Sequence, residues 1–79
     1  MTNLEKYTEV FTKTLDVTED VAKGLKYQDI TAWDSVGHMG LIAELEDTFG
    51  IMMDTDDIID LSSFEKGLEI LGEKYDVEF

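Results

Sequence analysis

The sequence predicts an all-α fold: a small four-helix bundle with three longer helices, a short third helix and a long first loop. Apolar residues recur at intervals of three and four in the longer segments, which is the spacing of a helix face. No segment alternates between apolar and polar residues, and proline is absent. A chain of 79 residues buries only about 60% of its unfolded surface, so we expect a single domain over residues 1–79.

The first helix is predicted over residues 3–15, where apolar side chains share one face and Thr2 or Asn3 can cap the start. Residues 16–33 form the long connection, in which Gly24 and two polar clusters interrupt any sustained period. Apolar side chains remain to anchor it, so we expect it to pack on the core, with a short helical turn as one option. These anchors are Val21, Leu25, Tyr27, Ile30 and Trp33.

The second longer helix is predicted from Ser35 to Phe49, with Gly50 as its stop. One stripe should face the core, and it consists of Ile42, Leu45 and Phe49, with Leu41 at its margin. A second stripe contains Val36, Met39, Gly40, Ala43 and Asp47, and it either packs on another helix or stays free for a partner. Gly37 and Gly40 indicate close approach by another surface, or simple tolerance near a helix start.

Two further helices are predicted after Gly50. Asp54 can cap a short helix that ends near Leu61, and Ser62 with Glu65 has the spacing of a capping box for the last helix. The last helix ends in an acidic tail that we expect to be frayed. Its apolar face consists of Phe64, Leu68, Leu71 and Tyr75.

The chain is strongly acidic. Asp and Glu number 19, Lys and Arg together number 6, and the formal net charge is −13, which argues against nucleic acid as a partner. No lysine lies between Tyr27 and Glu65. This half of the chain should attract basic proteins, or else it is a solvated face that keeps the protein in solution.

Cysteine is absent, so packing has to hold the fold and thiolate metal sites are excluded. No apolar run approaches the ~20 residues of a membrane span, and the first residues lack the pattern of a signal peptide. We therefore expect a cytoplasmic monomer that binds no membrane.

His38 is the only histidine, so we expect neither a histidine metal site nor a catalytic triad. The acidic stretch after Met53 matches a calcium-binding loop in part, but Ile59 stands where such a loop makes a sharp turn, normally with glycine. A calcium-responsive module therefore stays an alternative rather than the main hypothesis. The matching residues are Asp54, Asp56, Asp60, Ser62 and Glu65.

Ser35 is the strongest candidate for a functional side chain. It lies at a predicted helix start, where unpaired backbone N–H groups and the helix dipole favour a phosphate attached to the side chain. The alternative is that Asp34 or Ser35 merely caps the helix.

The step Asp34-Ser35-Val36 resembles the Asp-Ser-Leu motif of the acyl carrier protein family, which includes peptidyl and aminoacyl carriers. The resemblance continues through Met39, Leu41-Ile42, Leu45-Glu46-Asp47 and Phe49-Gly50-Ile51, and it extends over the whole chain in length, acidity and helix order. It implies a bundle of acyl-carrier type. A phosphopantetheinyl transferase would attach 4′-phosphopantetheine from coenzyme A to the serine, with magnesium, and the thiol would carry acyl groups as thioesters. The protein would be a carrier and not an enzyme.

In this sequence the resemblance makes Ser35 the attachment site and Asp34 the acid of the motif. It implies that acyl- or aminoacyl-loading and transferring enzymes with basic surfaces contact Val36, Met39, Gly40, Ala43, Glu46 and Asp47. Val36 in place of leucine, and Gly40 where an acid is common, indicate a specialised pathway rather than general fatty-acid synthesis. The alternatives are a peptidyl or aminoacyl carrier, and an acidic interaction module without a prosthetic group.

The resemblance also raises the question of where the cargo lies. A long acyl chain would shelter among the helices, whereas short or polar cargo would stay outside. The residues that would line the sheltered space are Leu41, Ile42, Leu45, Phe49, Ile58 and Leu68.

Overall fold

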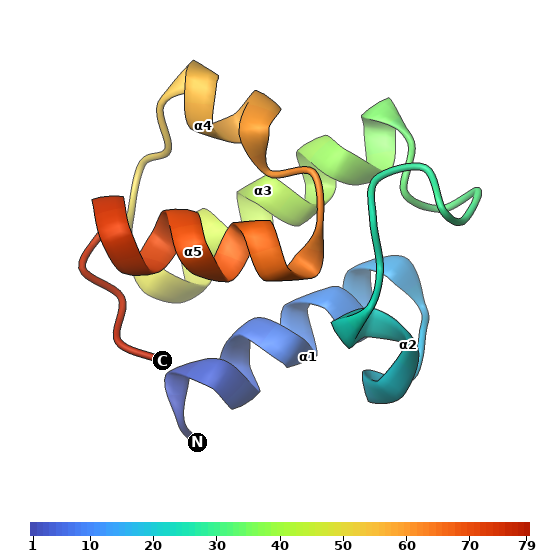
Figure 1. Cartoon of the computed structure of the whole chain (residues 1–79), viewed down its shortest axis with the longest axis horizontal. Coiled ribbons are helices and arrows are strands. Elements are labelled where there is room, and N and C mark those ends of the chain that lie inside the picture. Colours follow the sequence, from blue (N-terminus) through green and yellow to red (C-terminus); the bar gives the residue numbers. More distant parts are fainter.

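The computed structural model describes residues 1–79 and contains five helices and no strands (Figure 1). They are α1 (Asn3–Leu15), α2 (Glu19–Lys23), α3 (Ser35–Phe49), α4 (Thr55–Asp60) and α5 (Phe64–Lys74). The all-α prediction is confirmed, but the helices number five rather than four. The additional helix, α2, forms inside the first loop because the Thr18 hydroxyl accepts the Val21 N–H and caps its start. None of the five is long and apolar enough to cross a membrane.

The ends of α1 and α3 are set by local capping. Thr2 and Glu5 form a capping box, in which each side chain accepts the backbone N–H of the other residue. Gly50 ends α3, as predicted, in the left-handed conformation with a φ of 64°. Glycine adopts this conformation at little cost because it has no Cβ.

The predicted caps of the last two helices are corrected in part. Asp54 does stand before α4, but its side chain makes no capping hydrogen bond. The predicted capping box of α5 is wrong by one residue, because Ser63 and not Ser62 accepts the N–H of Lys66. Two consecutive serines offer the same chemistry, and the backbone path from α4 decides which one caps.

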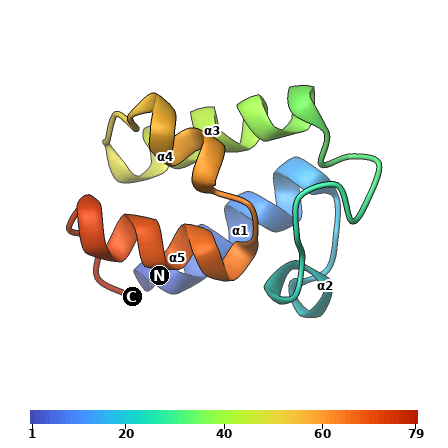
Figure 2. The ribbon, with the colours of Figure 1, turned by 45° about the horizontal axis from the view of Figure 1, so that its top comes forward.

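Aromatic side chains form the centre of the core. Tyr7 and Phe11 of α1 stack with their ring centroids 4.9 Å apart, and Phe64 of α5 meets both rings edge-on. Trp33 closes this cluster from the first loop, with its ring 5.5 Å from that of Phe11. Figure 2 shows α1 and α5 on one side of the molecule and α3 and α4 on the other.

The core stripe of α3 is close to the prediction. Ile42 and Leu45 are buried and Phe49 is half-buried, while Leu41, predicted at the margin, is fully buried. This face packs on α1, which is the main helix partner of α3.

The first loop is fixed to the bundle by backbone hydrogen bonds. The Tyr27 N–H donates to the Ser62 carbonyl at 2.8 Å, and the Phe64 N–H donates to the Leu25 carbonyl at 3.0 Å. They form an isolated antiparallel bridge to the connection between α4 and α5. The loop is therefore packed, as predicted, and Tyr27 is held beside Ser62.

The prediction of a frayed tail is wrong. Val77 is buried, and the ring of Phe79 lies 5.4 Å from that of Tyr7. The side-chain amide of Asn3 donates to the Glu78 carbonyl at 3.0 Å. Burial of Val77 and the ring contact of Phe79, which stays 45% exposed, outweigh the acidity of the segment.

Candidate functional site

Ser35 is the first residue of α3. Because Asp34 caps the helix, the Ser35 hydroxyl is not used as the cap. Asp34 occupies the N-cap, where its Oδ1 accepts the Gly37 N–H at 2.9 Å. The Ser35 side chain is exposed, and its Oγ lies 3.4 Å from the Tyr27 hydroxyl, which is a long and weak hydrogen bond. Asp34 is therefore the cap, and Ser35 is not.

Backbone donors at this helix start remain available. The N–H groups of Ser35 and Val36 make no hydrogen bond within the protein, whereas that of Gly37 is taken by Asp34. With the positive end of the helix dipole, they favour negative charge on the Ser35 side chain.

The presence of glycine at positions 37 and 40 of α3 has two different structural explanations. A Cβ at Gly37 would collide with the backbone carbonyl oxygen of Ala32, so the tight turn into α3 requires glycine there. At Gly40 a Cβ would meet only Cγ2 of Thr14, at an ordinary 3.9 Å. Close approach explains Gly37, and tolerance explains Gly40.

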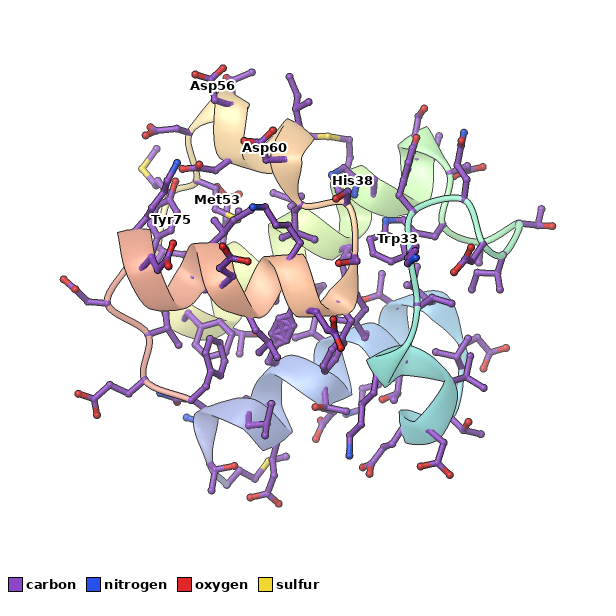
Figure 3. The ribbon with its side chains drawn as sticks, in the orientation of Figure 1. Trp33, His38, Met53, Asp56, Asp60 and Tyr75 are labelled. Atoms are coloured by element: carbon purple, nitrogen blue, oxygen red, sulfur yellow. The ribbon has the colours of Figure 1, made fainter.

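His38 joins α3 to the first loop and to α4. Its Nδ1 accepts the indole N–H of Trp33 at 3.0 Å, and its Nε2 lies 2.7 Å from the Ile58 carbonyl oxygen. An indole only donates and a carbonyl only accepts, so the ring is neutral with its proton on Nε2. Figure 3 shows Trp33 and His38 facing each other. Both ring nitrogens are engaged in holding the fold.

Exposed apolar side chains follow Ser35 along α3. Val36 and Met39 are 82% and 56% exposed, and Gly40 and Ala43 are also exposed. Solvent, and not a packed helix, faces Val36, Met39 and Ala43, whereas Gly40 lies at the groove between α1 and α3.

Two exposed apolar residues were not singled out in the sequence as surface residues. Ile59 of α4 is 71% exposed and Met52, between α3 and α4, is 87% exposed. Its neighbour Ile58 is partly buried and packs against the core, whereas Ile59 does not. Helix α4 spans only Thr55–Asp60, which is too short for a periodic pattern to separate its faces.

The acidic candidates divide into free and engaged residues. Asp47 is exposed and forms no ion pair. Glu46 is half-buried, and its Oε2 accepts the Met53 N–H at 2.9 Å. Glu46 thus holds the connection that follows α3. Asp56 and Asp60 of α4 are both exposed, and Figure 3 shows Asp56 pointing away from the bundle.

Asp57 is the buried acid of this region, and its burial was not predicted from the sequence. Its Oδ1 lies 2.7 Å from Nζ of Lys74, and its Oδ2 accepts the Tyr75 hydroxyl at 2.6 Å. These hydrogen bonds, first that from Lys74 and then that from Tyr75, lower the pKa of the carboxyl. Asp57 therefore fastens α4 to the end of α5.

The acidic stretch does not form the loop that the calcium alternative requires. Residues 55–60 are helical, and no group of three or more His, Cys, Asp or Glu side chains is arranged to hold a metal ion. The most buried carboxylate of this stretch, that of Asp57, binds Lys74 and Tyr75 instead.

Two main pockets open on the surface. The larger is a groove of about 560 Å³ between α1 and α3, with mainly polar lining residues that include Lys6, Lys13 and Glu44. The smaller, of about 210 Å³, lies beside Ser35 and is lined by Tyr27, His38, Ile59, Leu61 and Ser62. We regard the smaller one as part of the candidate site because its wall includes the residue that contacts Ser35.

The fold and the site together describe an acidic helical protein that presents a serine hydroxyl at a helix start beside an apolar surface. Neither the known protein families nor the curated proteins include a match to this chain.

Proposed function

We propose that the chain is an acyl carrier protein of a specialised pathway, which holds acyl groups on a 4′-phosphopantetheine arm attached to Ser35. One observation carries the proposal: Asp34 caps α3, so that the Ser35 hydroxyl stays exposed next to unpaired N–H groups. The resemblance of Asp34-Ser35-Val36 and its helix to the carrier family supports it. Five helices with a long first loop are compatible with a bundle of acyl-carrier type.

The residues at this site fit a phosphate-linked group. Ser35 is exposed, and the nearby Tyr27 hydroxyl can donate to an oxygen of an attached phosphate. In the attachment, the serine Oγ would bond to the phosphorus that bears pantetheine in coenzyme A. The P–O bond of the diphosphate would break, adenosine 3′,5′-bisphosphate would leave with the electron pair, and the serine proton would pass to a base of the transferase.

The arm, once attached, would supply a thiol that carries acyl or aminoacyl groups as thioesters. The chain's own part is to present the arm, at a high effective concentration, to enzymes that load and transfer the cargo. Val36 and Met39 offer apolar contact area next to Ser35. Asp47 and the exposed acids of α4, Asp56 and Asp60, would attract basic partner surfaces and speed their association with the chain.

The packing favours cargo that stays outside the bundle. Leu41, Ile42 and Leu45 are fully buried in the core, and neither main pocket is lined by any of the residues expected around a sheltered chain. A long chain would have to displace well-packed side chains, at a cost of about 1–3 kcal/mol or more. We therefore infer that the cargo is short or polar.

The attachment is tested by intact-mass measurement after incubation with coenzyme A, magnesium and a broad-specificity phosphopantetheinyl transferase. The wild-type chain should gain the mass of one phosphopantetheine, and Ser35→Ala should gain none. Thr48→Ala is the matched control, because it removes another exposed side-chain hydroxyl, near the other end of α3, and should still be modified. No gain on the wild type, or an equal gain on Ser35→Ala, would contradict the proposal.

An acidic interaction module without a prosthetic group is the second candidate. The exposure of Val36, Met39 and Met52 on an acidic protein favours it, since such a surface can bind a basic partner with no arm present. The same mass measurement separates the two, because this module gains no mass.

A further inference from the structure

The His38 imidazole joins the first loop to α4 and borders the smaller pocket. Its Nδ1 accepts the Trp33 indole N–H at 3.0 Å, and its Nε2–H donates to the Ile58 carbonyl oxygen at 2.7 Å. The bond from Trp33 requires the neutral ring, because a protonated imidazole carries a hydrogen on each nitrogen and can accept none. The link between Trp33 and α3 therefore depends on the protonation of His38.

Trp33 is the more firmly packed of the two rings. It is fully buried, and its ring centroid lies 5.5 Å from that of Phe11 in the aromatic centre of the core. The His38 side chain is only half-buried. If Nδ1 took a proton from solvent, two N–H groups would face each other, and the buried indole would lose its acceptor at a cost in free energy. The His38 ring is then the one that has to move.

The smaller pocket offers space into which this ring can turn. Its volume is about 210 Å³, and an engineered cavity of about 150 Å³ binds benzene, which is larger than imidazole. The other walls of the pocket are Tyr27, Ile59, Leu61 and Ser62. The hydroxyls of Tyr27 and Ser62 can accept the N–H groups of a protonated ring. A charged His38 therefore has both room and hydrogen-bond acceptors there.

No charged side chain holds a protonated ring beside the indole. On α3 itself, Asp34 lies one turn before His38 and is used as the helix cap. The titratable group of the first loop that packs on the ring is Tyr27, with centroids 5.4 Å apart. On α4, Asp57 is bound by side chains at the end of α5, and Asp60 is exposed and does not line the pocket. His38 forms no ion pair with any of these acids.

We propose that His38 is a pH-dependent switch. The neutral ring joins Trp33 to α4, and the protonated ring leaves the indole and turns into the smaller pocket. The joined form carries one proton fewer than the turned form, so a fall in pH favours the turned form. Tyr27 packs edge-on against the His38 ring, and its hydroxyl lies 3.4 Å from Oγ of Ser35. The switch therefore changes the surroundings of Ser35, and it does so whether or not a group is attached there.

The test is an NMR titration of the unmodified chain from about pH 8 to about pH 5, the interval in which histidine side chains ordinarily change charge. Imidazole ¹⁵N shifts report the protonation of His38, and the Nε1–H resonance of Trp33 reports its hydrogen bond. We expect the indole resonance to move upfield as the ring gains its proton. NOE cross-peaks from the His38 ring to Ser62 should then replace those to Trp33.

Three outcomes of this titration would overturn the inference. The first is a His38 ring that stays neutral over the whole interval. The second is an indole resonance that does not move while the ring is protonated. The third is a protonated ring that keeps its cross-peaks to Trp33.

Variants separate His38 from the other titrating groups. His38→Gln retains an amide that can donate and accept but cannot take up a proton in this interval, so its indole resonance should not depend on pH. Asp34→Asn is the control, because asparagine caps a helix as well as aspartate does, and it should keep the wild-type response. A response retained in His38→Gln, or lost in Asp34→Asn, would assign the proton to another group and contradict the inference. Both variants are first checked for a wild-type amide spectrum, and the wild-type titration decides if His38→Gln does not fold.

Discussion

The indole N–H of Trp33 donates to Nδ1 of His38 across 3.0 Å, and this bond fixes the protonation of the only histidine in the chain. The proton must then lie on Nε2, which faces the Ile58 carbonyl oxygen at 2.7 Å. Three separate segments meet at this ring. Imidazole ¹⁵N shifts should report the Nε2–H tautomer at neutral pH, and the Nδ1–H tautomer would contradict the hydrogen-bond assignment.

Replacing His38 should destabilise the fold. In His38→Ala the buried indole N–H of Trp33 and the Ile58 carbonyl both lose their partner, which should lower the free energy of unfolding by about 2 kcal/mol. Urea denaturation followed by tryptophan fluorescence measures this change. Met39→Ala, at the exposed neighbouring position, should change stability by less than about 0.5 kcal/mol. Equal effects of the two substitutions would show that the ring is not a structural tie.

Alanine substitutions at the two glycines of α3 should have opposite signs. Gly40→Ala should stabilise the protein by about 0.5–1 kcal/mol, because it raises helix propensity without a clash. Gly37→Ala should destabilise it by about 1–3 kcal/mol, because the new Cβ meets the Ala32 carbonyl. Thermal unfolding of both variants and of the wild type measures these changes in stability. A stable Gly37→Ala protein would mean that the turn before α3 can relax.

Asp57 should make the fold sensitive to acid. Its pKa is lowered in the folded state, so it adds stability that is complete above the ordinary carboxyl pKa of 3.8 and is lost as the pH falls through the lowered folded value. Urea midpoints of the wild type and of Asp57→Asn should differ most near neutral pH and converge in acid. Asp56→Asn is the control at an exposed position, and its difference from the wild type should show no comparable convergence.

Partner binding should depend on salt through the exposed acids. If the chain is a carrier, the affinity of the phosphopantetheinyl transferase for it should fall markedly between low and high ionic strength, because exposed charges are screened within about 10 Å at 0.1 M salt. Binding measured by calorimetry across a salt series tests this, and an association constant that does not change would contradict the electrostatic part of the proposal.

Asp47 and Glu46 should respond differently to neutralisation, although they are adjacent. Asp47→Asn should weaken partner binding and leave stability unchanged, since this side chain is exposed and has no ion pair. Glu46→Ala should lower stability by about 1–2 kcal/mol, since it removes the acceptor of the Met53 N–H. A stability loss in Asp47→Asn would show that its charge supports the fold.

Helix positions could be predicted because their determinants are local. The spacing of Ile42 and Leu45 marks the core face of α3, and a glycine in the left-handed conformation marks its end. The start of α5 and the anchoring of Phe79 could not be predicted in the same way. Both depend on how distant segments approach one another, as in the contact of Phe79 with Tyr7.

For the candidate site, the sequence indicated the serine and its exposed stripe but not its surroundings. The bond between His38 and the Ile58 carbonyl joins residues 20 positions apart, and no periodic pattern encodes it. The same holds for Glu46, a half-buried acid that resembles its exposed neighbour in sequence. The pocket beside Ser35 arises only when α4 is brought next to the first loop.

The anchored tail brings the two ends of the chain together, through the bond from Asn3 to Glu78 and the contact of Phe79 with Tyr7. Both ends lie on the side of the molecule away from the start of α3 (Figures 1 and 2). A short peptide that joined them would close the backbone into a ring and reduce the entropy of the unfolded chain. The protein could likewise be immobilised on a sensor surface by either end, with Ser35 directed toward the solution.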